Sequence, residues 1–118
     1  MNPVMAGILK LYENALAQRG IVRMEAVLGD STGETTRERK LGHARWMIDQ
    51  MLHPDGMPIL SDERLCLAWL GFVQGVLWAE GMFTLSALRD HARQLVAVPS
   101  TTVKERSDKA TVSPKSKK

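Results

Sequence analysis

Apolar residues recur every three or four positions in the first half of the chain, a spacing that predicts two amphipathic helices. The first helix is predicted to begin at Pro3 after Asn2, a favourable N-cap, and Gly20 is its expected end. Over residues 21–28 two alternatives stay open, because both a longer helix and a short strand fit the pattern. The second helix is predicted over residues 37–52.

Capping signals mark where the helices should start and end. Thr35 and Glu38 have the spacing of a capping box before the second helix. Ser61 is the expected N-cap of a third helix, and Gly81 is the expected residue of its C-terminal turn. Thr84 is the expected N-cap of a fourth helix. These signals divide the chain into four helices with short connections.

The third helix contains the most apolar part of the chain. Over residues 65–83 only Gln74 and Glu80 interrupt a run of apolar or small side chains. A helix that is apolar on every side needs other protein around it. With the last helix expected over 85–95, the pattern predicts an all-α domain of four antiparallel helices.

Small residues form a stripe along this third helix, at Ala68, Gly71, Gly75 and Ala79. A glycine inside a helix costs about 1 kcal/mol relative to alanine, so two of them indicate close approach by another backbone or a large side chain. Because three short helices cover only one side of a fourth, we expect a homodimer with the stripe and Trp78 in its interface. The alternative is a monomer in which the glycines serve packing within the chain.

The formal net charge of +3 is unevenly distributed. From Pro99 onward there are six basic and two acidic residues, whereas residues 1–98 hold ten basic and eleven acidic ones. The polar composition after Pro99 predicts a disordered basic tail over 99–118, next to one helical domain over 1–98. A domain without a basic excess lacks the electrostatic footprint that duplex binding requires.

No recognisable pattern for catalysis or metal binding is present. His43, His53 and His91 have no metal-ligand spacing with one another or with Cys66. The glycines of the third helix do not follow a strand, so no phosphate-binding loop is predicted. Cys66 cannot form an internal disulfide and is expected to be a buried, inert thiol. We therefore expect a cytoplasmic protein without enzyme activity, metal, cofactor or membrane span.

Nucleic-acid binding is one functional alternative. The third and fourth helices, over 61–96, have the length of a helix-turn-helix, and the tail lysines could neutralise phosphates without sequence preference. The same residues also suit an ordinary solvated helix face and a solubilising tail. The expected contacts with nucleic acid are Arg89, Arg93, Lys104, Lys109 and Lys115.

The run over residues 68–93, about a quarter of the chain, resembles a segment found in small uncharacterised proteins encoded by bacteriophages and prophages. The resemblance implies an accessory phage gene product and names no activity, so it assigns no role to any residue. The residues that carry it are Trp69 to Phe72, Gln74 with Gly75, Leu77 with Trp78, Gly81, Thr84, and Leu88 with Arg89.

Such an origin and the lack of catalytic groups predict a binding function. We expect an accessory or inhibitory protein that acts on a host protein or complex in the host cytoplasm, with Trp46 or Trp78 as the contact centre. Trp46 stands out because the period of its helix does not require it, although it would also suit a position at the edge of the core. A dimeric nucleic-acid-binding protein is the alternative.

Overall fold

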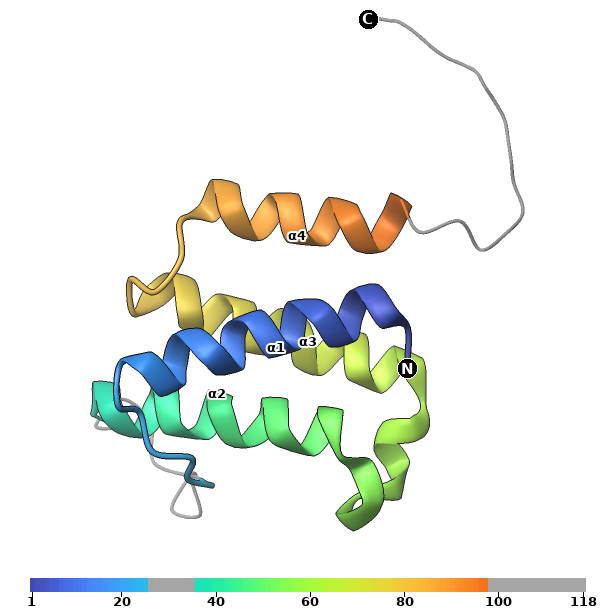
Figure 1. Ribbon diagram of the computed structural model, residues 1–118, viewed down its shortest axis with the longest axis horizontal. Coiled ribbons are helices and arrows are strands. Elements are labelled where there is room, and N and C mark those ends of the chain that lie inside the picture. Colours follow the sequence, from blue (N-terminus) through green and yellow to red (C-terminus); the bar gives the residue numbers. More distant parts are fainter. Residues whose placement is uncertain (26–35, 98–118) are drawn as a thin grey trace, which may run out of the picture.

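The computed structural model describes residues 1–25 and 36–97, and within these ranges it contains helices and no strand. Consecutive α-helices run in opposite directions and lie roughly parallel to the long axis (Figure 1). The predicted all-α architecture is therefore confirmed. The elements are α1 (Pro3–Gln18), α2 (Arg37–Leu52), the short 3-10 helices η1 (Pro54–Gly56) and η2 (Pro58–Ser61), α3 (Glu63–Ala79) and α4 (Leu85–Ala97).

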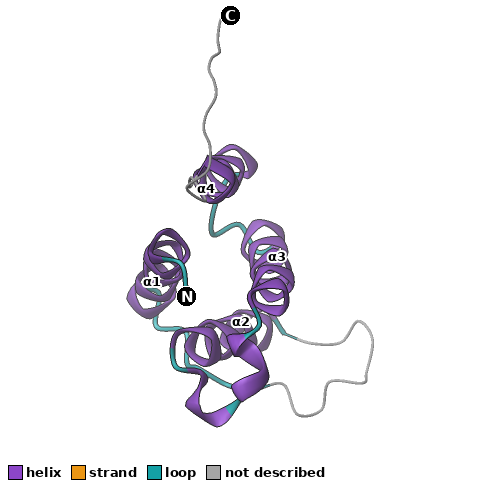
Figure 2. Ribbon diagram, turned by 90° about the vertical axis from the view of Figure 1, so that its right-hand side faces the viewer, coloured by secondary structure: helices purple, strands orange, loops and turns teal. Residues whose placement is uncertain are grey.

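The core lies between the first three α-helices. Figure 2 shows α1, α2 and α3 around a common centre, with α4 outside them on the side opposite α2. In α1 and α3 the buried residues recur every three or four positions, as the apolar pattern predicts. α4 contributes only Leu88 to the buried apolar core of the described residues, so it is the most peripheral helix.

The predicted start and end of α1 are confirmed. The side-chain Oδ1 of Asn2 accepts a hydrogen bond from the Val4 amide at 2.7 Å. Gly20 has a φ of 73°, a left-handed conformation that favours glycine, and the Ile21 amide donates to the Leu16 carbonyl across this turn. Residues 21–25 form neither a helix nor a strand, and residues 26–28 lie outside the described ranges.

Two predicted caps are wrong by one residue. Pro58 favours a 3-10 turn that includes Ser61, so α3 begins one residue later, where Asp62 accepts a hydrogen bond from the Arg64 amide at 2.9 Å. At α2, Thr36 caps the helix by accepting from the Arg39 amide at 3.2 Å, and Thr35 lies outside the described ranges.

The predicted connection between α3 and α4 is confirmed. Gly81 has a φ of 76° in the turn after α3, and the Met82 amide donates to the Leu77 carbonyl at 2.8 Å. The Thr84 hydroxyl accepts a hydrogen bond from the Ala87 amide at 3.1 Å, which caps α4. This connection fixes where α4 leaves α3.

The segment after α1 packs closely on α2. The Met24 amide donates to the Gly42 carbonyl at 3.0 Å, and a Cβ atom placed on Gly42 would lie 2.6 Å from the Val22 carbonyl oxygen. Glu13 of α1 forms an ion pair with Arg45 of α2 at 2.8 Å. Backbone contact and ion pair together tie α1 to α2.

Candidate interaction surface

α3 has one buried side and one exposed side. Its inward residues Cys66, Leu70, Val73 and Leu77 are at most 3% exposed. On the opposite side three large apolar residues are about half exposed: Leu67 (48%), Phe72 (56%) and Trp78 (54%). A single copy of the chain thus leaves one side of this apolar helix in water. We call this side the outer face of α3 and define it by Leu67, Ala68, Gly71, Phe72, Gly75, Trp78 and Ala79.

The predicted small-residue stripe lies in the middle of the outer face, between Phe72 on the α2 side and Trp78 on the α4 side. No heavy atom of a described residue lies within 4 Å of a Cβ placed on Gly71 or on Gly75, beyond the helix itself and the neighbouring residues. The close approach that these glycines predict therefore does not occur within the described part of the chain. Packing among the described residues of one copy does not explain them.

The outer face is uncharged along its whole length. The sequence has no charged residue from 65 to 79, a helical length of about 22 Å at 1.5 Å per residue. At the N-terminal end the Arg64 side chain is 91% exposed. At the C-terminal end the Glu80 carboxylate is held by Lys40 at 2.9 Å and is only 13% exposed.

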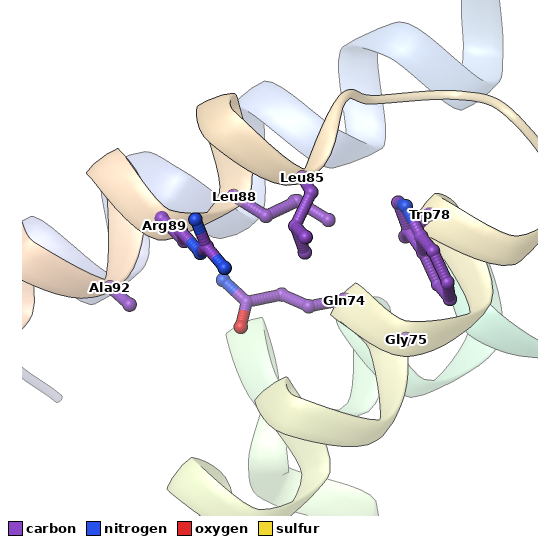
Figure 3. Close-up of a pocket in the computed structure, with 7 residues that line it drawn as sticks. All are labelled: Gln74, Gly75, Trp78, Leu85, Leu88, Arg89 and Ala92. Carbon is purple, nitrogen blue, oxygen red and sulfur yellow. The ribbon is translucent and has the colours of Figure 1, made fainter.

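A shallow groove runs along the outer face where α4 leaves α3, and Trp78 stands at one end of it (Figure 3). Its volume of ≈ 230 Å³ is below the roughly 300–1,000 Å³ typical of small-ligand pockets. The groove therefore suits a side chain of a partner better than a cofactor. Its lining residues are Gln74, Gly75 and Trp78 from α3, and Leu85, Leu88, Arg89 and Ala92 from α4.

The basic residues predicted to contact nucleic acid do not form a basic surface on α4. Arg93 pairs with Asp90 of the same helix. Arg89 is exposed at the groove and forms no hydrogen bond or ion pair with the residues that the structure describes. Lys104, Lys109 and Lys115 lie outside the described ranges. On α4, one unpaired arginine is a weak basis for binding phosphates.

Trp46 belongs to an aromatic cluster between α2 and α3. Its indole stacks on His43 with centroids 5.4 Å apart and lies 6.1 Å from Trp69, while Phe72 approaches His43 edge-on at 6.4 Å. Trp46 is partly buried against the core, so the alternative prediction of a core-edge role fits it better than that of an exposed anchor. Burial lowers the pKa of His43 within this cluster, although the charge of Glu25 opposes the shift.

A partly buried hydrogen-bond network joins α1, α3 and α4, and sequence reasoning missed it. The Tyr12 hydroxyl lies 2.7 Å from Nδ1 of His91, and the Gln74 amide donates to the same hydroxyl at 3.0 Å. Burial raises the pKa of Tyr12, so the phenol keeps its proton near neutral pH. The available signal was Gln74, a polar interruption in an apolar run, but its partner is distant in sequence.

Cys66 is buried, as predicted. Its Sγ lies 3.0 Å from the Leu60 carbonyl oxygen, and burial raises the pKa of the thiol above its usual value. The described residues contain no group of three or more histidine, cysteine, aspartate and glutamate side chains that could hold a metal ion. Among the described helices, none combines the length and the apolar character that crossing a membrane requires.

Comparisons with protein-family models, with curated proteins and with solved structures find no match for this chain. The geometry of the molecule is therefore the basis on which its function has to be argued.

Proposed function

We propose that this protein acts by binding another protein through the outer face of α3. The observation that carries this proposal is the exposure of Leu67, Phe72 and Trp78 on one continuous, uncharged side of a helix. Scattered apolar residues are normal on protein surfaces, but a gathered apolar face is typical of an interaction site. Trp78 is the proposed contact centre, because tryptophan is enriched among the residues that dominate binding energy.

The exposed area is large enough to matter energetically. An aromatic side chain has about 150–250 Å² of surface, so the exposed halves of Phe72 and Trp78 together amount to about 150–250 Å². At about 25 cal/mol per Å², covering them contributes roughly 4–6 kcal/mol. This is a substantial share of the free energy of a micromolar complex, which is about 8 kcal/mol.

Two side chains capable of nucleophilic or acid–base chemistry, Cys66 and His91, lie away from the outer face of α3. Cys66 is buried with a raised pKa, and His91 is engaged by Tyr12. Neither residue lines the groove beside Trp78. The resemblance of residues 68–93 to phage and prophage proteins favours a host protein or complex as the target, in the cytoplasm of a bacterial host.

The test is affinity capture from bacterial lysate with the tagged full-length chain, with and without nuclease. We expect a protein partner that survives nuclease treatment. Because Trp78 is the proposed anchor, Trp78→Ala should lower its recovery at least about tenfold, equivalent to about 1.4 kcal/mol. Leu11→Ala is the matched control, since Leu11 is 45% exposed on α1 and lies off the outer face of α3.

Two results would contradict the proposal. Equal recovery by the Trp78 and Leu11 variants would mean that the outer face is not the contact surface. Recovery only with intact nucleic acid would favour the alternative of a nucleic-acid-binding protein.

A further inference from the structure

We infer that in the free protein a second copy of this chain covers the outer face of α3, with the two α3 helices antiparallel across a two-fold axis near Val73. The inference rests on the proposed function in one respect, since both assign protein binding to the same face. It adds that a second copy of the chain covers this face before any host protein binds. Self-association can be measured whether or not a host protein is found.

The stripe of small residues is nearly symmetric about its own centre. Ala68 and Ala79 lie at equal distances from a point just after Val73, and Gly71 and Gly75 lie at equal distances from Val73 itself. In an antiparallel pair, residues equally far from the axis on opposite sides face each other. Small residues therefore meet small residues along the seam, and the two backbones can approach closely.

The same register brings each large residue opposite a small one. With the axis at Val73, Trp78 of one copy lies at the level of the second copy's Ala68, and Phe72 lies within one residue of the level of its Gly75. No described side chain occupies the space over Gly75, so that space is free for a ring from the second copy. A two-fold interface requires one patch that supplies both the protruding and the receiving groups, and the outer face supplies both.

Charge selects the antiparallel direction. The antiparallel pairing places the Arg64 side chain, which is 91% exposed and pairs with Asp62 at 3.5 Å, near the C-terminal end of the second copy's α3. The last carbonyl groups of a helix carry a partial negative charge and favour a cation. A parallel pair would instead bring the two Arg64 side chains together. Between the two ends the seam contains no charge, because residues 65–79 have no charged side chain.

The area predicts a weak dimer. The exposed halves of two aromatic rings, together with Leu67 and the small-residue stripe, come to roughly 400 Å² per copy, within the usual range for a functional surface patch. Two such faces bury roughly 800 Å², below the roughly 1,200–2,000 Å² of a standard interface. We therefore expect dissociation in the micromolar range and a visible dependence on concentration.

Sedimentation of the full 118-residue chain tests the inference. Between about 1 and 300 µM the average mass should rise from that of one copy towards that of two. Gly75→Leu should weaken the dimer at least tenfold, because its side chain fills the seam. The monomer should keep its helical circular dichroism, since that position faces open space and leucine favours a helix. Gly7→Leu is the matched control, being an exposed glycine of α1 with equally open space, and should leave the dimer unchanged.

Engineered cysteines test the direction of pairing. With the axis near Val73, the two copies of residue 68 are about 16 Å apart along the helix, whereas residue 68 of one copy faces residue 79 of the other. Under mild oxidation the double variant Ala68→Cys/Ala79→Cys should form covalent dimers, and Ala68→Cys alone should not. Rapid cross-linking of Ala68→Cys alone would overturn the antiparallel arrangement.

A wild-type chain that stays monomeric throughout this range, or a Gly75→Leu variant that dimerises like Gly7→Leu, would overturn the inference. These failures are distinct from failure of the proposed function. A monomer that still captures a host protein through Trp78 would leave the proposed function intact and remove the second copy. A dimer that captures no host protein would support the second copy on this face and contradict the proposed function.

Discussion

Tyr12 helps to hold the peripheral helix α4 to the rest of the molecule, beside the core contact of Leu88. Its hydroxyl joins His91 of α4 to Gln74 of α3, and the phenol itself is fully buried. Removing a hydroxyl that bonds to two groups costs more than the two hydrogen bonds themselves. Each of the two groups is left without a hydrogen-bond partner in the folded protein. Tyr12 thus positions the α4 wall of the groove.

We expect Tyr12→Phe to lower the free energy of unfolding by about 0.5–1.5 kcal/mol, because the partly buried amide of Gln74 and the ring nitrogen of His91 lose their partner. Urea unfolding followed by circular dichroism measures the change. Combining Tyr12→Phe with Gln74→Leu should cost less than the sum of the two single changes, since they share one hydrogen bond. Strict additivity, or an unchanged midpoint for Tyr12→Phe, would contradict the role given to this network.

At the scale of residues, sequence reasoning succeeded where the partners are close in the chain. Asn2 and Thr84 cap helices through amides two and three positions away, and the left-handed turn at Gly81 depends only on local backbone geometry. The bond between Tyr12 and His91 spans 79 positions. Two polar residues that far apart give no periodic signal, because their meeting depends on how the helices pack.

At the scale of elements, the contact between α2 and the segment after α1 depends on Gly42. The Val22 carbonyl oxygen occupies the space that a side chain at this position would need. The Met24 amide bonds to the Gly42 carbonyl, so the two backbones touch directly. This contact determines the course of the chain as it leaves α1.

We expect Gly42→Ala to destabilise the fold by about 1–3 kcal/mol, because a Cβ 2.6 Å from a backbone oxygen forces the segment away from α2. Gly7→Ala is the control, since it adds a methyl group in open space and should stabilise α1 by up to about 1 kcal/mol. Thermal melting of both variants measures the difference. Equal melting temperatures would mean that the segment is not held against α2.

The helices were predictable because their apolar period and their capping residues depend on residues that are close together in the sequence. The bounds of α2 were predicted correctly, but its cap is Thr36 and not Thr35, and α3 starts one residue later than its predicted cap implied. At α3 the cause is a 3-10 turn beginning at Pro58, which takes Ser61 and leaves Asp62 as the cap. Where two adjacent residues cap a helix about equally well, a neighbouring turn of this kind determines which of them becomes the N-cap.

At the scale of the whole molecule, the central feature is an apolar helix with one side inside the core and the other outside it. The sequence predicted that α3 is apolar all round, but it could not tell which side faces the other helices. That choice depends on which side of α3 packs into the core: Leu70 and Val73 are buried there, whereas Phe72 and Trp78 are more than half exposed. The stripe was predictable, and its exposure was not.

Covalent footprinting with a small radical reagent and mass spectrometry tests most directly whether protein covers the outer face of α3 in the dimer or in a complex with a host protein. Phe72 and Trp78 should label strongly in dilute protein and lose most of that labelling in concentrated protein or in a captured complex. Val22 and Ile59, exposed by 67% and 65% away from this face, should label equally in every sample. Undiminished labelling of Phe72 and Trp78 in all samples would contradict the role of the outer face as a binding surface.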